Sequence, residues 1–258
     1  MIAARLGARS RKHVREGCNQ PLGHLAPNGD DKLHIAERTL TFINAVFKSY
    51  GPSSIKRLLW DKEYAGDKWN FADNTIGDCV YRHLERYAAN GSILDLGCGT
   101  GNTATELAAT AYQLYVGVDI SDTALNKAIA RTQASGRETK NRFVQADFLG
   151  YTPAQQFDTI LFRESMYHVP MGKVTAILDR YSPYLKEGGV FIVRMKTAGA
   201  DGKIKSRPQA MLAAITAEFD VVDNCQYAES GATVLVVRPR GRSQKSGIAA
   251  ASTNSGEK

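Results

Sequence analysis

Short apolar segments alternate with helical patterns through the middle of the chain. The segments are rich in Val, Ile, Leu and Phe, as buried strands are, and they lie at residues 93–96, 114–119, 142–148, 157–162, 190–193, 219–222 and 232–237. The last two are joined by a short loop that contains Ser230 and Gly231, which predicts an antiparallel pair. The pattern therefore predicts a single α/β domain with a Rossmann-like, seven-stranded mixed sheet that ends in an antiparallel hairpin.

Two helices are predicted ahead of the first strand. Steps of three and four predict one helix from Asp31 to about residue 48, ended by Gly51-Pro52, with an apolar stripe made of Leu33, Ala36, Leu40, Ile43 and Phe47. This stripe should pack on another part of the protein. Residues 74–88 predict a second helix, with one apolar face made of Ile76, Val80, Leu84 and Tyr87.

A glycine-rich turn follows the first strand and organises the rest of the chain. Gly97, Gly99 and Gly101 stand at alternate positions, and a helix over residues 101–111 is predicted after them, with Leu107 and Ala108 facing inward. Glycine lacks a Cβ, so a ligand can lie almost against this backbone and near the free N–H groups of the helix. The turn predicts a nucleotide-type pocket at the carboxyl end of a parallel strand.

The spacing of the glycines distinguishes two kinds of cofactor. A dinucleotide-binding turn needs its third glycine at position 102, where this chain has Asn102, so NAD fits poorly. Asp95 inside the strand followed by Gly97-Cys98-Gly99-Thr100-Gly101 resembles motif I of the class I S-adenosylmethionine-dependent methyltransferases, in the form D-L-G-C-G-T-G. The alternative is a glycine turn that binds no ligand.

The resemblance extends over about residues 60–238 and implies a function. It implies a seven-stranded methyltransferase sheet with added N-terminal helices, and S-adenosyl-L-methionine as the cofactor. It also implies that the cofactor is bound by residues of the motif, which are Asp95, Gly97, Cys98, Gly99 and Gly101. The N-terminal helices could cover the cofactor as a lid, or they could simply pack on the core.

Two acids at strand ends are further candidates. Asp119, with Ile120 beside it, ends the second strand, where its carboxylate can accept hydrogen bonds from both hydroxyls of a ribose. The alternative for Asp119 is a helix N-cap together with Ser121. In the resembled family, the position of Asp147 carries the acid that meets the adenine amino group, and Phe148 would lie beside the ring. The alternative for Asp147 is a turn-forming residue.

Four aromatic residues crowd a polar stretch at residues 60–71. The arrangement is similar to the segment ahead of the first helix in small-molecule members of the family, where aromatic side chains lie beside the methionine end of the cofactor. The resemblance implies that Tyr64 and Trp69 line the pocket. Anchoring in the hydrophobic core is the alternative.

Residues 163–168 follow the fourth strand, at the edge where a substrate should arrive. Arg163 is expected on the cofactor side, and Glu164 is expected to orient the substrate or the methionine end of the cofactor. His168 has the unperturbed pKa best suited to taking a proton near neutral pH, so it is the candidate general base. Tyr167 should form a wall. The alternative for His168 is a residue that only packs or caps the helix near Pro170.

The positive charge of the chain lies in its two ends. The net charge is +7, of which residues 1–30 carry +3 and residues 238–258 carry +4, so the middle is neutral. A small-molecule substrate is therefore favoured over nucleic acid as the partner. No (N/D)-P-P-(Y/F) string follows the fourth strand, which counts against a DNA amino-methyltransferase. An RNA or DNA methyltransferase that uses basic tails remains the alternative, and an NAD-dependent oxidoreductase is a weaker one.

Composition excludes several other classes. The four cysteines are scattered and show no metal-ligand spacing, so the sequence predicts no metal site and no disulfide scaffold, and a reducing cytoplasm is the simple inference. No apolar run approaches the roughly 20 residues of a membrane span. No feature of the sequence indicates an oligomeric state.

The chain divides into four expected parts. Residues 1–30 are expected to be a disordered basic leader, with an organelle transit peptide as the alternative. Residues 31–71 form the N-terminal helix and an aromatic cap segment. Residues 72–239 form the cofactor-binding domain, and residues 240–258 form a disordered basic tail.

Overall fold

A computed structural model describes the backbone of residues 29–66 and 75–241, and the side chains of residues 38–66 and 75–241. Most of the predicted leader and tail, and the candidate Trp69, lie outside these described residues. Contacts divide the chain into two units, residues 1–41 and residues 42–258. The second unit contains the sheet and all the side chains discussed below as parts of the site.

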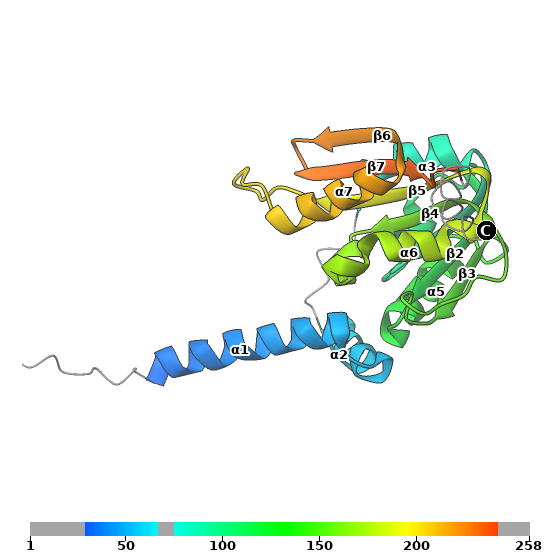
Figure 1. Ribbon diagram of the computed structural model, residues 1–258. Helices are drawn as coiled ribbons and strands as arrows, with labels where there is room; N and C mark the ends of the chain where they lie inside the picture. The colour runs from blue at the N-terminus through cyan, green and yellow to red at the C-terminus, as the bar shows by residue number, and fades with distance from the viewer. Residues whose placement is uncertain (1–28, 67–74, 242–258) are drawn as a thin grey trace, which may run out of the picture. The chain divides into compact units, whose positions relative to one another are not determined.

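The sheet has seven strands in the order β3-β2-β1-β4-β5-β7-β6 (Figure 1). Neighbours from β3 to β5 are parallel, and β7 is antiparallel to both β5 and β6. The predicted mixed sheet and its closing hairpin are therefore confirmed. The strands are β1 (Gly91–Leu96), β2 (Tyr112–Asp119), β3 (Asn141–Gln145), β4 (Phe157–Arg163), β5 (Leu185–Lys196), β6 (Asp220–Tyr227) and β7 (Ala232–Arg238).

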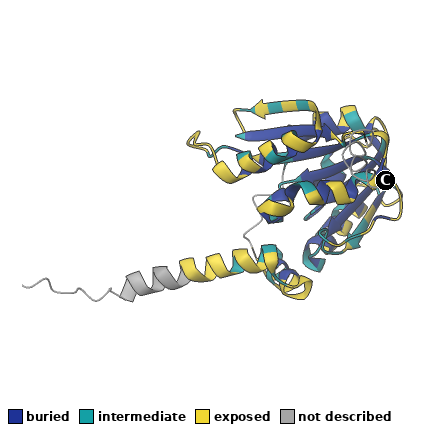
Figure 2. Cartoon of the chain, viewed as in Figure 1, coloured by how far each residue is buried: buried dark blue, intermediate teal, exposed yellow. Residues whose placement is uncertain are grey.

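Helices cover both faces of the sheet, so its central strands are buried (Figure 2). Successive side chains of β1 point to opposite faces, and each face has its own core. Leu94 and Leu96 belong to the core under α6 (Val174–Tyr181) and α7 (Ser206–Glu218). Ile93 belongs to the other core, together with residues of α3 (Val80–Ala88) and α4 (Asn102–Glu106). Helix α5 (Asp122–Ala134) follows β2. Short 3₁₀ turns lie at Met166–His168, Met171–Lys173 and Ser182–Tyr184.

Two predicted helices are shorter than expected. Helix α3 begins at Val80, and Ile76, which the periodicity placed on its apolar face, is 79% exposed. Gly77 interrupts the helix because its φ of 80° is left-handed, and the backbone N–H of Thr75 instead donates to Glu106. Helix α4 ends at Glu106, so Leu107 is buried as predicted but Ala108 is exposed.

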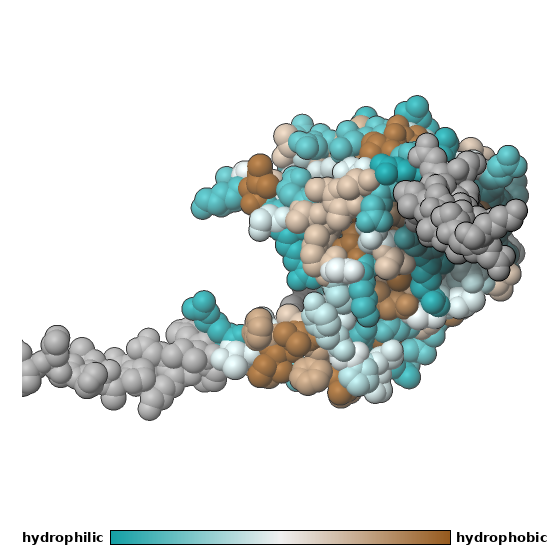
Figure 3. Space-filling view, in the orientation of Figure 1, coloured by the Kyte–Doolittle hydropathy of each residue, from teal (hydrophilic) through white to brown (hydrophobic). Residues whose placement is uncertain are grey.

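The N-terminal region holds two helices, α1 (Gly29–Tyr50) and α2 (Ser53–Ala65). The end of α1 before Gly51-Pro52 matches the prediction. The expected packing of its apolar stripe is wrong for the stripe members whose side chains are described, because Leu40, Ile43 and Phe47 are 60%, 42% and 41% exposed. Figure 3 shows hydrophobic side chains at the surface over the end of α1 and α2. Among the described residues, no helix combines the length and apolarity needed to cross a membrane.

Candidate active site

A cavity of about 980 Å³ lies beyond the carboxyl ends of β1, β2 and β4, and α2 supplies part of its wall. Its size falls within the range of small-molecule and cofactor sites. Parallel strands place the residues that follow them at one edge, which explains why candidates far apart in sequence meet here. The predicted site residues that line the cavity are Tyr64, Gly97, Cys98, Gly99, Asp119, Ile120, Asp147, Phe148, Arg163, Glu164, Tyr167 and His168.

The glycine turn has the backbone that its sequence requires. Gly97, Gly99 and Gly101 have φ angles of 82°, 53° and 75°, which is the region that favours glycine. The N–H groups of Gly97 and Cys98 donate to the carbonyl of Val118 at 2.8 and 3.1 Å, so the turn is tied to β2.

The three glycines face different surroundings. A Cβ on Gly97 would lie 2.5 Å from the Cβ of Ser165, and one on Gly101 would lie 2.7 Å from the Cβ of Ala128. Among the described residues, a Cβ on Gly99 would meet only the side chain of Tyr64, whose hydroxyl would lie 3.0 Å away. Gly101 therefore allows α4 and α5 to pack, whereas Gly99 leaves room for a ligand.

Asp119 connects the glycine turn to the start of α5. One carboxylate oxygen accepts from the N–H of Gly99 and the other from the N–H of Ser121, both at 2.9 Å. Burial raises the pKa of this carboxyl to about 6, although the backbone N–H groups oppose the shift. The N-cap of α5 is Ser121, whose hydroxyl accepts from the N–H of Ala124 at 3.1 Å. Asp119 itself faces the cavity, where it can accept further hydrogen bonds.

Asp95 lies beneath the turn instead of on the cavity surface. It is 1% exposed, and its carboxylate accepts a hydrogen bond from the Tyr115 hydroxyl at 2.7 Å. Burial raises the pKa of Asp95 to about 6, against the lowering effect of that hydrogen bond. Among the described candidates, Asp95 and Gly101 do not line the cavity, and both support the glycine turn from the side that faces the core.

Asp147 already has a partner. Its Oδ2 accepts from the ammonium group of Lys56 at 2.9 Å and from the hydroxyl of Ser53 at 3.1 Å, both from α2. The N–H of Gly150 also closes a backbone turn on the carbonyl of Asp147 at 2.9 Å. Both interpretations of Asp147 therefore have support, since it forms a turn and faces the cavity beside Phe148.

Four charged groups form a network at the end of β4. The Arg163 and Arg194 guanidinium groups lie 2.9 and 3.2 Å from the same oxygen of Asp78, and Arg194 also pairs with Glu164. Burial alone would raise the pKa of Asp78, but Arg163 and Arg194 together lower it, so Asp78 is ionised. All four side chains line the cavity.

Glu164 has an unusual backbone. Its φ of 56° lies in the left-handed region, which is sparsely populated by residues other than glycine, and its N–H donates to the carbonyl of Arg194 at 3.0 Å. Backbone strain of this kind gathers at functional sites, where the surrounding structure maintains it.

His168 is packed against an aromatic side chain of α2. Its ring meets that of Trp60 edge to face, with centroids 4.7 Å apart and an interplanar angle of 82°. Burial lowers the pKa of His168 to about 4, and Lys48 adds to the effect, so the imidazole is neutral at pH 7. Tyr167 beside it anchors the end of β5, since its hydroxyl donates to the carbonyl of Lys196 at 3.1 Å.

Several lining residues were missed from the sequence. Lys56 and Trp60 come from α2. The apolar pattern did not predict this helix, because its apolar residues Ile55 and Leu58 are exposed and do not form a stripe that faces the core. The spacing of Lys56, Trp60 and Tyr64 at steps of four is a signal that could have shown it. Asp78 and Arg194 carried no such signal, because their roles depend on their pairing with residues far away in sequence.

Known proteins resemble this chain in sequence and in fold. The methyltransferase domain family matches residues 93–189. A protein of Geobacillus sp. (strain WCH70) that carries the name methyltransferase is 32% identical over 117 residues, which cover 44% of this chain and 46% of the relative. The protein-lysine N-methyltransferase EFM4 of Saccharomyces cerevisiae is 28% identical over 163 residues, covering 52% of this chain and 71% of that protein.

A solved structure shares the fold. It is the 1,6-didemethyltoxoflavin-N1-methyltransferase of Burkholderia thailandensis with bound 1,6-didemethyltoxoflavin and S-adenosylhomocysteine, at a TM-score of 0.57, 17% identity and coverage of 73% of this chain and 88% of that one. Residues 93–189 are therefore similar in sequence to the methyltransferase domain family, and the sheet has the fold of a methyltransferase solved with S-adenosylhomocysteine.

Proposed function

We propose that this protein transfers a methyl group from S-adenosylmethionine to a hydroxyl or an amine of a small metabolite. One observation carries the proposal: a single cavity joins the glycine turn and Asp119 to the charged network and His168 that follow β4. A cofactor on one side of this cavity would lie next to an acceptor on the other. The Burkholderia protein, which has the same fold and was solved with bound 1,6-didemethyltoxoflavin, supports the size class of the substrate.

The residues present fit the cofactor. Gly99 leaves space where a side chain would stand, and the Asp119 carboxylate can accept from the ribose hydroxyls while it is fixed by two backbone N–H groups. Ile120 and Phe148 offer apolar contact for the adenine ring. Arg163 and Tyr64 face the same cavity and would meet the methionine end. The bound cofactor would supply an electrophilic methyl group, so alignment of the acceptor is the main task of the protein.

The part of the cavity that would hold the methyl acceptor combines a neutral base with charged side chains that are held by ion pairs. The proposed base, His168, has its lone pair available at neutral pH, but its pKa of about 4 makes it a weak proton acceptor. It therefore suits an acidic hydroxyl, and an amine that binds in its neutral form needs no base. Glu164 is held by Arg194, and Tyr167 is held by Lys196, so both act by positioning.

The test begins with the cofactor. Calorimetry should show binding of S-adenosylhomocysteine and none of NAD, and Asp119→Ala should weaken the former. A screen for methyl-donor consumption across phenols, amines and amino-acid derivatives then identifies the acceptor, with total protein extract and RNA as separate arms. If the protein bound NAD but not S-adenosylhomocysteine, or if it turned over only with protein or only with RNA, the proposed function would be wrong.

A further inference from the structure

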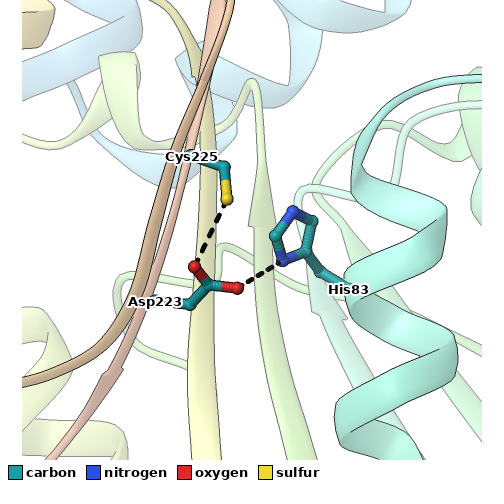
Figure 4. A group of neighbouring side chains, drawn as sticks. All are labelled: His83, Asp223 and Cys225. Atoms are coloured by element: carbon teal, nitrogen blue, oxygen red, sulfur yellow. Dashed lines mark hydrogen bonds and ion pairs between the residues drawn. The ribbon is translucent and has the colours of Figure 1, made fainter.

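Three potential metal ligands that the proposed function does not use meet between α3 and β6. They are His83 on the helix and Asp223 and Cys225 on the strand (Figure 4). His83 Nδ1 lies 3.4 Å from Asp223 Oδ2, and Cys225 Sγ lies 3.3 Å from Asp223 Oδ1. The three ligand atoms all lie within 4.8 Å of one another.

The fold produces this cluster from residues that are far apart in sequence. Asp223, Cys225 and Tyr227 alternate along β6 with the exposed Asn224 and Gln226, so they share the more buried face of the strand. His83 is 3% exposed and reaches this face from α3. The Asp223 side chain is 22% exposed, so an ion can reach the cluster from solvent.

The distances suit a tetrahedral ion. Bonds of about 2.0–2.3 Å from Zn²⁺ to nitrogen, oxygen and sulfur place tetrahedral ligands about 3.3–3.6 Å apart. Each oxygen of Asp223 lies at such a distance from one of the other two ligand atoms, Oδ2 from His83 Nδ1 and Oδ1 from Cys225 Sγ, so binding through one oxygen requires a rotation of the carboxylate. Imidazole, carboxylate and thiolate are also the zinc ligands found in proteins. A thiolate and a carboxylate together neutralise the divalent charge, which makes a partly buried ion less costly.

Tyr227 would support the histidine. Its hydroxyl lies 2.7 Å from His83 Nε2. If Nε2–H donates to this hydroxyl, the lone pair of Nδ1 faces the carboxylate of Asp223, and two acceptors then point at one space. In this tautomer a cation between them removes the repulsion, whereas in the other tautomer Nδ1–H donates to Asp223 directly. An outer hydrogen bond of the first kind is how metal-binding histidines are usually oriented.

We propose that His83, Asp223 and Cys225 form a Zn²⁺ site with three protein ligands and a fourth position open to water. The thiol of Cys225 loses its proton when the ion binds. The ion links the edge strand β6 to α3, which starts two residues after Asp78 in the charged network of the cavity. Zinc at this site therefore stabilises the helix that supports one wall of the cavity.

The site is tested by titrating the metal-free full-length protein with Co²⁺, whose absorption reports tetrahedral and thiolate ligation. We expect one equivalent to bind with a sulfur-to-cobalt charge-transfer band, to be displaced by Zn²⁺, and to be lost in Cys225→Ser. Cys79→Ser is the matched control, because this thiol lies in the same part of the fold but outside the cluster, and it should bind Co²⁺ as the wild type does.

Two further measurements distinguish the site from a simple structural cluster. Tyr227→Phe keeps all three ligands and should weaken Zn²⁺ binding about 10- to 100-fold instead of abolishing it. Zn²⁺ should protect Cys225 from alkylation, as mass spectrometry of the labelled peptides reports, while Cys79 is labelled as before. Saturable Co²⁺ binding that survives in Cys225→Ser, or no saturable binding in a folded wild-type protein, would refute the proposal.

Discussion

The ammonium group of Lys56 on α2 lies 2.9 Å from the carboxylate of Asp147, which follows β3. Trp60, one turn further along the same helix, meets His168, and Tyr64, another turn along, lies next to Gly99. One face of α2 thus touches three separate parts of the cavity. A short helix that the apolar pattern did not predict has become a wall of the site.

This ion pair should stabilise the attachment of α2. Lys56→Ala leaves a partly buried carboxylate without its cationic partner, and we expect a loss of about 1–3 kcal/mol in the free energy of unfolding. Urea unfolding measures the change. Lys62→Ala removes an exposed lysine from the same helix and should leave the midpoint almost unchanged. Equal effects of the two substitutions would show that the ion pair contributes nothing.

Cofactor affinity should depend on Asp119. Loss of a charge-assisted contact costs about 2–3 kcal/mol, so Asp119→Ala should weaken S-adenosylhomocysteine binding by tens-fold or more. Calorimetry on the folded variant gives the value, and Asp220→Ala on the distant edge strand serves as the control. Unchanged affinity in Asp119→Ala would remove the ribose assignment.

The same carboxyl should make cofactor binding depend on pH. Its folded pKa of about 6 is raised above that of the unfolded chain, so the group is ionised at pH 7 and takes up a proton as the pH falls through 6. Protonation removes an acceptor, and affinity should then fall by up to about tenfold for each pH unit. The fall should be shallower in Asp119→Asn. An affinity that stays constant between pH 7.5 and pH 5 contradicts this mechanism.

Substitution of two glycines of the turn should affect different properties of the protein. A methyl group on Gly101 meets Ala128, including its backbone, so Gly101→Ala should lower the melting temperature. A methyl group on Gly99 points to the cavity, so Gly99→Ala should reduce cofactor affinity more than stability. Thermal denaturation and calorimetry on both variants separate the effects. The reverse ranking would mean that the cofactor does not approach Gly99.

The proposed catalytic role of His168 predicts a defined dependence of the rate on pH. A base is active when it is neutral, and a pKa of about 4 keeps His168 neutral from pH 6 to pH 9. The acidic limb expected from an ordinary histidine should therefore be missing from that range and appear near pH 4. His168→Ala should lower kcat while cofactor affinity is preserved.

A matched variant separates chemistry from packing. His168→Phe keeps a ring against Trp60 but cannot accept a proton. If His168 is the base, this variant should therefore be as slow as His168→Ala. If either variant retains a rate within about threefold of wild type, which is under roughly 1 kcal/mol of barrier, His168 has no part in proton transfer.

The sheet could be predicted from sequence because its signals are local. Apolar runs such as residues 157–162 identify buried strands, and the glycine turn marks the edge where the site forms. The charged network could not be predicted, because Asp78 meets Arg163 and Arg194 only after distant segments are brought together. The low pKa of His168 depends likewise on burial against Trp60, which no spacing records.

The strained backbone of Glu164 places two demands on one position. Glycine or asparagine would adopt its φ of 56° at a lower energetic cost, while only the glutamate can pair with Arg194 beside the cavity. If Glu164 positions the substrate as proposed, selection for thermostability and selection for turnover therefore favour different residues here. A directed-evolution experiment that rewards heat resistance alone should replace Glu164 early, and one that also rewards turnover should keep it.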